Sequence, residues 1–185
     1  AMRLDSEARR RGLRALDAPV SGGDKGAQAG TLTIMVGGDP EDFEACRPLF
    51  EAMGKTIVHE GTSGAGQHTK MANQIAIAGA IAGVCEAIAY AQANGLDCRR
   101  VLETIGTGAA GSWQMTHNGA NILQDNYAPG FFIKHFIKDL NLAIEQAQSQ
   151  GLALSVTELV RSRYEKLAEE GYADAGTQAL IKSYS

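Results

Sequence analysis

One stretch decides the fold of this chain: Gly61-Thr62-Ser63-Gly64-Ala65-Gly66-Gln67-His68-Thr69-Lys70-Met71-Ala72-Asn73-Gln74. A short apolar run, Thr56-Ile57-Val58, leads into its three glycines, and a long Ala/Ile-rich segment follows them. This composition predicts a helix from about Gly66 to Asn94, which Gly95 ends. The chain therefore changes near residue 61 from strand-forming to helix-forming sequence.

Lys70 lies near the start of this predicted helix. The unpaired amides and the positive end of the helix dipole disfavour another positive charge there, so we expect its pKa to lie below the usual range. Such a lysine can accept and donate a proton near neutral pH. Asn73 and Gln74 share its helix face and could hold a polar substrate beside it. The pattern predicts a catalytic acid/base; the alternative is a solvated lysine after a flexible hinge.

Two nucleotide-binding motifs match this stretch incompletely. Gly64-x-Gly66 imitates the dinucleotide fingerprint, but Thr69 stands at the position of its third glycine. Gly61 and Gly66 have the separation found in a P-loop, but Gln67 occupies the position of the P-loop lysine. The phosphate-binding interpretations are therefore less favoured than the acid/base interpretation.

The residues before this stretch predict a small α/β arrangement. A helix with Asp5 or Ser6 as its N-cap is expected first, and Asp39 and Pro40 mark the start of another. In chain order, the predicted elements are helix 3–12, strand 13–20, strand 31–36, helix 39–54 and strand 55–59. His59, at a strand end, is interpreted as a structural or surface residue.

A loop crowded with glycine is predicted between Ser21 and Gly30. Its backbone amides could converge on an anion, and the Ser21 hydroxyl adds a donor. Open α/β sheets place ligands at strand ends of this kind. The loop is either a carboxylate cradle or a plain surface loop.

Helical periodicity continues after residue 61. Small residues such as Gly79 and Gly83 in the long helix predict close packing between other helices. Lys138 has mostly apolar neighbours in the sequence, so it either snorkels to water or meets an anion. The further helices are expected at 99–105, after Ser112, from 131 to about 151, at 157–170 and at 176–183.

Composition excludes several classes of function. Apolar residues make up 44% and charged residues 21% of the 185, with a net charge of −4, and there is no basic stripe, so nucleic-acid binding is not indicated. The apolar run from Ile75 to Cys85 is too short for a membrane span. The three cysteines lack metal-binding spacing and predict reduced thiols in a cytoplasmic compartment, with no metal.

The motifs together resemble the β-hydroxyacid dehydrogenase family, which includes 3-hydroxyisobutyrate dehydrogenase and tartronate semialdehyde reductase. The stretches that carry the resemblance are Asp17-Ala18-Pro19-Val20-Ser21-Gly22-Gly23, Gly30-Thr31-Leu32 through Val36-Gly37-Gly38, Gly64-Ala65-Gly66 with Lys70 and Asn73, and Pro129-Gly130-Phe131 with Lys138-Asp139-Leu140. Their order and spacing match the family over nearly the whole chain.

The resemblance implies a fold: residues 1–60 as the last part of a Rossmann-type NAD(P)-binding domain, and residues 61–185 as an all-α, 6-phosphogluconate dehydrogenase-like domain for substrate binding and dimerisation. It also implies hydride transfer between NAD or NADP and a short 3-hydroxyacid or semialdehyde. A homodimer or homotetramer is expected to form through the helical domain.

The same resemblance implies roles for individual residues. Lys70 would be the general acid/base, which argues against the imine-reducing relatives that usually lack this lysine. The substrate contacts would be Ser21, Gly22, Gly23, Asn73 and Gln74, and the cofactor contacts Phe131, Lys138 and Asp139. Gln74 stands where many relatives carry a second asparagine.

Members of this family begin with a strand and a glycine-rich fingerprint, and neither is found before Arg3. We therefore expect a truncated enzyme that binds cofactor poorly and turns over little by itself. One alternative is a non-catalytic helical dimerisation module that retains relic site residues. Another is a helical protein that binds small carboxylates through Ser21 and Lys70 without nicotinamide.

Overall fold

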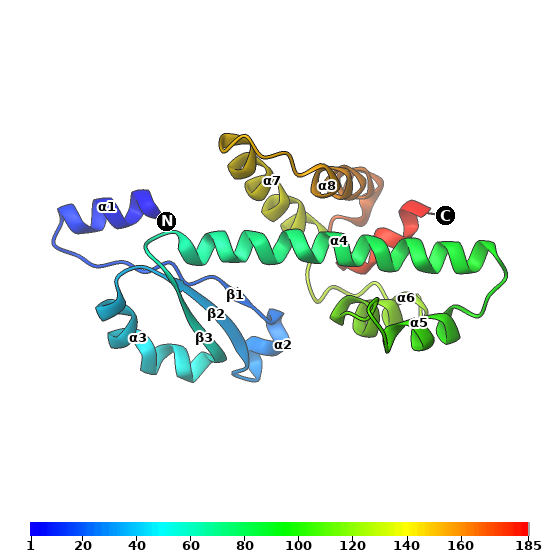
Figure 1. Ribbon diagram of the computed structural model, residues 1–185, viewed down its shortest axis with the longest axis horizontal. Helices are drawn as coiled ribbons and strands as arrows, with labels where there is room; N and C mark the ends of the chain where they lie inside the picture. Colours follow the sequence, from blue (N-terminus) through cyan, green and yellow to red (C-terminus); the bar gives the residue numbers. More distant parts are fainter. Residues whose placement is uncertain (185) are drawn as a thin grey trace. The chain divides into compact units, whose positions relative to one another are not determined.

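The computed structural model describes residues 1–184. The chain forms two compact units, Ala1–Asn73 and Gln74–Ser185. The long helix α4 (Ala65–Ala93) contributes its first turns to unit 1 and the remainder to unit 2. An α/β segment is thus followed by a helical one, which confirms the predicted fold class (Figure 1).

Unit 1 is built on a three-stranded sheet with the order β1-β2-β3. Strand β1 (Val20–Ser21) is antiparallel to β2 (Leu32–Gly37), and β2 is parallel to β3 (Gly54–Gly61). Helix α3 (Pro40–Met53) makes the crossover between the two parallel strands. Its Phe43 and Phe50 pack on the apolar side chains of β2, which forms the core of this unit.

The predicted strand 13–20 is largely absent. Asp17 makes an isolated bridge to Gly37, and only Val20 and Ser21 join the ladder. Pro19 has no N–H to donate, so it contributes only its carbonyl, which accepts from the amide of Met35. The chain therefore runs extended beside β2 without completing a strand.

Two further predictions for unit 1 were wrong. The expected glycine loop contains a short helix, α2 (Gly23–Gln28), whose N-cap residue Gly22 has a φ of 128° that glycine adopts readily. The second wrong prediction is that Asp5 or Ser6 caps the first helix. Helix α1 (Met2–Arg10) begins earlier, and its N-cap residue, Ala1, makes no side-chain hydrogen bond. Asp5 bonds instead to Arg9, one turn further along α1.

Within residues 74–184, the regular elements of unit 2 are all helices, and one isolated bridge joins Phe132 to Gly176. Its elements after α4 are α5 (Cys98–Gly106), the π-helix η1 (Gln114–Gly119), α6 (Ala120–Ile122), α7 (Ile133–Ser149), α8 (Ser155–Leu167), the π-helix η2 (Ala168–Tyr172) and the 3-10 helix η3 (Thr177–Tyr184).

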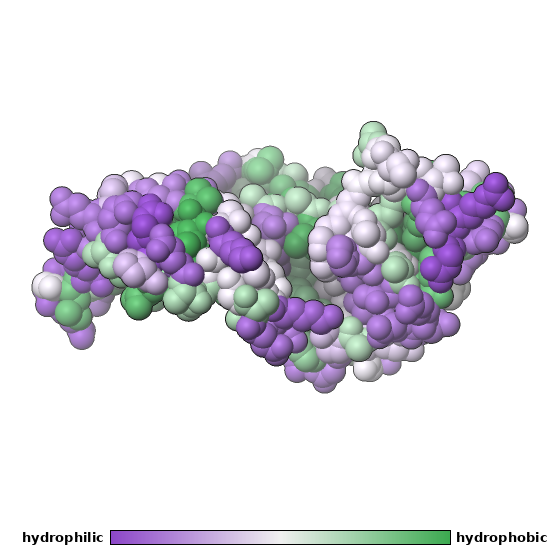
Figure 2. All heavy atoms as spheres, turned by 90° about the horizontal axis from the view of Figure 1, so that it is seen from below, coloured by the Kyte–Doolittle hydropathy of each residue, from purple (hydrophilic) through white to green (hydrophobic). Residues whose placement is uncertain are grey.

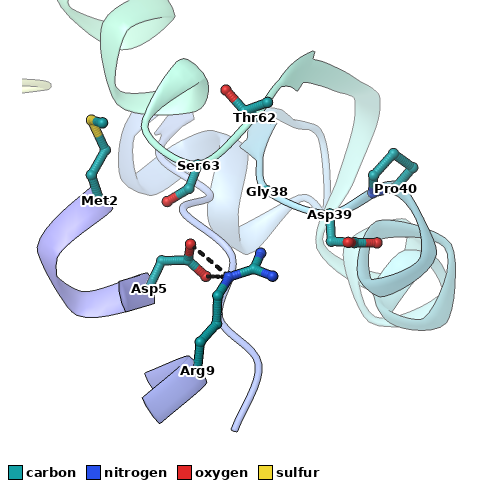
Figure 3. Close-up of a pocket in the computed structure, with 8 residues that line it drawn as sticks. All are labelled: Met2, Asp5, Arg9, Gly38, Asp39, Pro40, Thr62 and Ser63. Atoms are coloured by element: carbon teal, nitrogen blue, oxygen red, sulfur yellow. Dashed lines mark hydrogen bonds and ion pairs between the residues drawn. The ribbon is translucent and has the colours of Figure 1, made fainter. Parts of the chain in front are cut away.

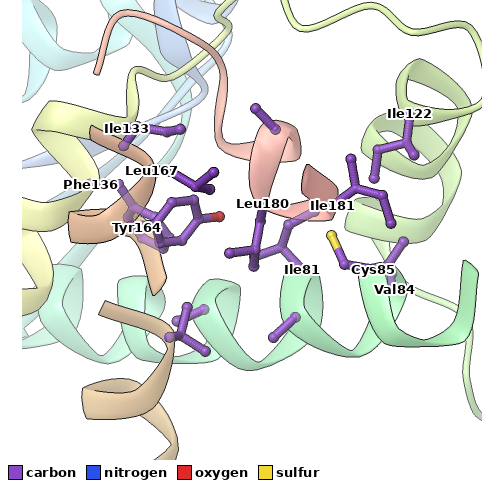
Figure 4. Packing of buried hydrophobic residues seen from close by; sticks show 14 of the residues in the cluster. Ile81, Val84, Cys85, Ile122, Ile133, Phe136, Tyr164, Leu167, Leu180 and Ile181 are labelled. Atoms are coloured by element: carbon purple, nitrogen blue, oxygen red, sulfur yellow. The ribbon is translucent and has the colours of Figure 1, made fainter. Parts of the chain in front are cut away.

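The core of unit 2 gathers side chains from α4, α7, α8 and η3, with further ones from α5, η1 and α6 (Figure 4). Ile81 and Cys85 of α4 meet Phe136 of α7, Tyr164 of α8 and Leu180 of η3, and all five are fully buried. The Tyr164 hydroxyl donates a 2.8 Å hydrogen bond to the carbonyl of Thr177. The last helical segment is thereby held against α8.

Helix α4 is a core helix on one side only. By length and composition it is the one helix among residues 1–184 that could cross a membrane, and 44% of its most apolar window is buried in the protein. On the other side Ala76, Gly79 and Gly83 are exposed, and a Cβ added at either glycine would meet nothing within 4 Å. The expected close packing of other helices on these glycines is therefore not found within residues 1–184.

Candidate functional site

The start of α4 is held by the carboxylate of Asp17. The amides of Gly64 and Gln67 donate to its two oxygens at 2.6 and 2.9 Å, and Asp17 is only 9% exposed. A carboxylate at this position satisfies unpaired amides and interacts favourably with the helix dipole. The helix that carries Lys70 therefore has a fixed first turn.

Two glycines make this close approach possible. A Cβ at Gly37 would lie 2.7 Å from a carboxylate oxygen of Asp17, and one at Gly66 would lie 2.9 Å from the other. The same Cβ at Gly66 would collide with the carbonyl of Met35. Gly66 of the deciding stretch and Gly37 of β2 thus allow α4 to lie close against β2.

This arrangement bears on two predictions made for the stretch. The amides that a phosphate would use at Gly64-x-Gly66 are already turned toward a carboxylate, which disfavours phosphate binding there. The carboxylate also offsets part of the positive field at this helix end, and the expected activation of Lys70 stays a prediction.

Lys70 and Asn73 lie on the early turns of α4, and both are half-buried. They are three positions apart, so their side chains leave the helix at neighbouring positions of one face. A rigid helix rather than a loop positions both side chains.

The predicted carboxylate-binding residues form the turn from β1 into α2. Ser21 pairs with Thr33 in the ladder and is half-buried, whereas Gly22 and Gly23 are exposed with φ values of 128° and 63°. A Cβ at Gly22 would come within 3.2 Å of the Leu32 side chain. The turn therefore favours glycine both for its backbone conformation and for its space.

In unit 2 the structure brings three predicted site residues together. The Gln74 amide nitrogen donates to one oxygen of Asp139 at 2.7 Å, and Lys138 Nζ lies 3.0 Å from the other oxygen. Gln74 is 1% exposed and Asp139 7%, whereas the Lys138 side chain is 65% exposed. Lys138 therefore has most of its side chain in water, as snorkelling predicts, and it also meets an anion, which is its neighbour in the sequence.

Phe131 lies just before α7 and is held in place by both its ring and its backbone. The ring meets Phe136 edge-on at a centroid distance of 5.9 Å, and the Phe131 carbonyl accepts from the amide of Thr177. The half-buried ring is therefore fixed near the start of the helix that carries Lys138.

His59 has structural contacts, as predicted. Its Nε2 lies 2.9 Å from the carbonyl of Gly38, and its ring lies 5.1 Å from that of Phe43. The histidine therefore links β3 to the end of β2.

A hollow of about 360 Å³ in unit 1 is lined by none of the predicted site residues. Figure 3 shows Arg9 of α1 bonded to Asp5 within it, with Asp39, Thr62 and Ser63 around the pair. Because the arginine already has an acidic partner, the hollow does not present a free cation for an anionic ligand.

The sequence analysis did not reveal that Asp17 anchors the start of α4. Its amide partners lie 47 and 50 residues away, so no local spacing indicates the contact. The only sequence feature that singled out Asp17 was its position as the first residue of the stretch Asp17–Gly23, which carries the family resemblance.

Comparison with protein families matches almost all of the chain. Residues 64–184 match the NAD-binding domain of NADP-dependent 3-hydroxyisobutyrate dehydrogenase, and residues 1–61 match the NAD-binding domain of 6-phosphogluconate dehydrogenase. The chain belongs to the β-hydroxyacid dehydrogenase family. Both matched models describe nicotinamide-dinucleotide-binding domains, which confirms NAD or NADP as the cofactor class of this family.

Individual relatives agree with this assignment. The uncharacterized oxidoreductase YkwC of Bacillus subtilis is 52% identical over 98% of the chain and 63% of its own length. The NAD-dependent L-serine dehydrogenase of Pseudomonas aeruginosa is 42% identical over the whole chain and 64% of its own length.

A solved structure, the Mycobacterium tuberculosis 3-hydroxyisobutyrate dehydrogenase with L-serine, superimposes with a TM-score of 0.91 at 31% identity. The match covers 99% of this chain and 65% of that one. The chain thus spans slightly less than two thirds of the length of each of these relatives. The predicted Rossmann-type and 6-phosphogluconate dehydrogenase-like architecture is confirmed.

Proposed function

We propose that this chain is the substrate-binding part of an NAD(P)-dependent 3-hydroxyacid dehydrogenase, with Lys70 as its general acid/base. The observation that carries the proposal is the start of α4, where the Asp17 carboxylate fixes the helix that positions Lys70 and Asn73. General acid/base groups act efficiently when a rigid element holds them.

In the direction of oxidation, neutral Lys70 accepts the proton of the substrate hydroxyl as its carbon–oxygen bond becomes a carbonyl. In the reverse direction, the Lys70 ammonium returns a proton to the developing alkoxide. NAD(P), when bound, accepts or supplies the hydride. Asn73 orients the hydroxyl by hydrogen bonding, and the Ser21-Gly22-Gly23 turn holds the carboxylate.

Residues in α7 and just before it suit the nicotinamide end of the cofactor. Phe131 offers a fixed aromatic ring, and the exposed Lys138 ammonium offers a cation anchored on Asp139. The start of α4 is occupied by Asp17 and does not suit the pyrophosphate. We therefore assign Phe131, Lys138 and Asp139 to the nicotinamide and substrate end only.

A short 3-hydroxyacid or the corresponding semialdehyde is the proposed substrate. The Pseudomonas aeruginosa relative is named for L-serine, and the Mycobacterium tuberculosis structure was solved with L-serine, which also carries its hydroxyl on the carbon next but one to the carboxylate. The exposed glycine turn after Ser21 supports recognition of a carboxylate by backbone amides.

We assign residues 1–60 to the Rossmann-type domain and residues 61–185 to the substrate and dimerisation domain. The 185-residue chain by itself is proposed to turn over little, because the dinucleotide motif at Gly64–Thr69 is incomplete and its amides are engaged. The three free cysteines and the buried side of α4 support a cytoplasmic protein.

A second candidate function, a helical dimerisation module, is favoured by the exposed side of α4 at Ala76, Gly79 and Gly83. Figure 2 shows hydrophobic residues among hydrophilic ones on one face of the molecule. We propose a homodimer or homotetramer through the helical unit, and this assembly is compatible with the enzyme.

The deciding experiment follows nicotinamide absorbance with L-serine and 3-hydroxyisobutyrate. The chain is tested alone and joined to the part of the Bacillus subtilis relative that it does not span, here termed the joined enzyme. Oxidation by the joined enzyme, lost in Lys70→Ala, supports the dehydrogenase. If the joined enzyme folds and binds cofactor but oxidises neither acid, the result favours the dimerisation function over the dehydrogenase.

A further inference from the structure

Gln74 is a buried amide whose hydrogen bonding is directed into the protein. It is 1% exposed, and its nitrogen donates to Asp139 across the contact between α4 and α7. A side chain so enclosed does not reach a substrate from this conformation. Its donated hydrogen bond to Asp139 is a route by which it can affect the reaction.

Asp139 has a defined partner for each carboxylate oxygen. Gln74 donates to one oxygen at 2.7 Å, and Lys138 Nζ lies 3.0 Å from the other. Because the two oxygens are fixed in one plane, the bond from Gln74 sets the direction in which the second oxygen points. The orientation of this carboxylate is thus coupled to the amide of Gln74.

Lys138 depends on that orientation. Adjacent residues on a helix do not normally face each other, so Lys138 must fold back to reach the carboxylate of the next residue. Its side chain is 65% exposed, and its ammonium lies 3.0 Å from the Asp139 carboxylate. The direction of this buried carboxylate therefore bears on where the ammonium lies.

We propose that Gln74 is a positioning residue that acts through Asp139 to place the Lys138 ammonium for an anionic or carbonyl group of the bound substrate or cofactor. The inference rests on the proposed dehydrogenase function. Gln74 is then not a substrate contact but a residue that positions one, Lys138. This role also explains why the side chain at position 74 is glutamine and not the shorter asparagine. Asparagine is shorter by one carbon–carbon bond, about 1.5 Å, and would not reach Asp139 from the same backbone.

The first test reads Lys138 directly in the 185-residue chain. Lysines are labelled by reductive ¹³C-methylation, and the Lys138 signal is assigned with Lys138→Arg. In Gln74→Met, which keeps the volume and removes the donor, the Lys138 signal is expected to move to the position and narrow width of the exposed Lys166 signal. Gln74→Asn should have the same effect.

The matched control is Gln178→Met. Gln178 is another buried glutamine of unit 2, and its amide nitrogen donates to the carbonyls of Asn126 and Ala128. Its loss should lower the melting temperature as the loss of Gln74 does, without moving the Lys138 signal. A Lys138 signal unchanged in folded Gln74→Met, or moved equally by Gln178→Met, overturns the proposal.

The second test separates this inference from the function on which it rests. In the joined enzyme, Gln74→Met should raise KM for substrate or cofactor about tenfold while kcat changes less than about twofold, as expected for the loss of a charge-assisted contact. If the unaltered joined enzyme oxidises no hydroxyacid, the proposed function fails, and the Lys138 signal still decides the role of Gln74. If the enzyme is active and KM does not change in Gln74→Met, the positioning role is wrong.

Discussion

The buried amide of Gln74 donates a 2.7 Å hydrogen bond to Asp139, a residue 65 positions later in the chain. This bond joins α4 to α7 inside the helical unit, at the point where Lys138 reaches the same carboxylate. A buried carboxylate is stable only when its oxygens are satisfied, so the cluster contributes to folding as well as to the proposed site.

Removal of Asp139 should therefore destabilise the helical unit. We expect Asp139→Leu to lower the free energy of unfolding by about 1 to 3 kcal/mol, because it leaves the buried Gln74 donor without this acceptor. The measurement is urea denaturation followed by circular dichroism. Asp174→Leu is the control, since its ion pair with Lys134 is largely exposed and should contribute less than about 1 kcal/mol. Equal losses in the two variants would contradict the prediction.

Removal of Asp17 should loosen the first turn of α4. Asp17→Ala deletes two charge-assisted acceptors at a helix N-terminus and should cost about 1 to 3 kcal/mol, whereas Asp17→Asn keeps one acceptor and should cost less. Hydrogen exchange at the amides of Gly64 and Gln67 measures the effect at its site. Asp39→Ala, at the N-cap of α3, provides the control: it should speed exchange at Glu41 and leave α4 protected. Unchanged exchange at Gly64 in Asp17→Ala would rule out the anchor.

The sequence was sufficient for elements whose signals are local. Strand β2 alternates and branches, α3 has an Asp39 cap followed by Pro40, and α4 ends before Gly95, so each was predicted close to its observed bounds. Residues 13–20 were predicted as a strand on composition, but the pairing of a strand depends on partners that a single stretch does not reveal. Pro19 further limits that pairing by lacking a donor.

The candidate site shows the same contrast between features with local sequence signals and features that depend on distant residues. Lys70, Asn73 and the Ser21 turn were found from motifs that lie within a few residues of one another, and their roles remain predictions. The contacts that support the site join residues far apart in the sequence, Asp17 to Gly64 and Gln74 to Asp139. Gln74 was predicted as a substrate contact from its position beside Asn73, and only the packing of α4 on α7 reveals its buried partner.

Lys70→Ala should abolish most of the turnover of the joined enzyme without unfolding it. Loss of a general acid/base typically costs 10²- to 10⁴-fold in rate, so we expect kcat to fall by about that factor with a melting temperature close to that of the unaltered enzyme. Lys166→Ala serves as the control, because Lys166 lies exposed on α8 beside Glu170 and should leave kcat unchanged. Comparable turnover in Lys70→Ala would remove Lys70 from the mechanism.

Alkaline pH should destabilise unit 2. Burial raises the pKa of the Cys85 thiol to about 12 and raises the pKa of the Tyr164 hydroxyl well above its usual value. Between pH 9 and 12 the unfolded chain releases the thiol proton while the folded chain retains it, so stability falls as pH rises, by up to about 1.4 kcal/mol per pH unit for this group. Below pH 9 both states keep the proton, and this group adds no pH dependence.

Urea denaturation from pH 7 to 11 tests this prediction. Cys85→Ala should be less stable at pH 7, because it leaves a small cavity, but its stability should decline less steeply above pH 9. Cys46→Ser is the control and should decline as the unaltered chain does, since the half-buried Cys46 lies in unit 1. A decline of equal slope in Cys85→Ala would assign the alkaline loss to other groups.

Substitution of the exposed glycines of α4 should have different effects in a monomer and in a dimer that packs on this face. Apart from the backbone of α4 itself, no atom of residues 1–184 lies within 4 Å of a Cβ at Gly79 or Gly83, so alanine at each should stabilise an isolated helix by about 1 kcal/mol. If the proposed homodimer packs on this face, a larger side chain must instead push the second copy away. We therefore expect Gly79→Leu to raise the monomer fraction in sedimentation equilibrium without lowering the helical content. Glu103→Leu, an exposed position on α5, controls for added surface hydrophobicity and should leave the association unchanged. If Gly79→Leu assembles as the unaltered chain does, the dimer interface lies elsewhere on the helical unit.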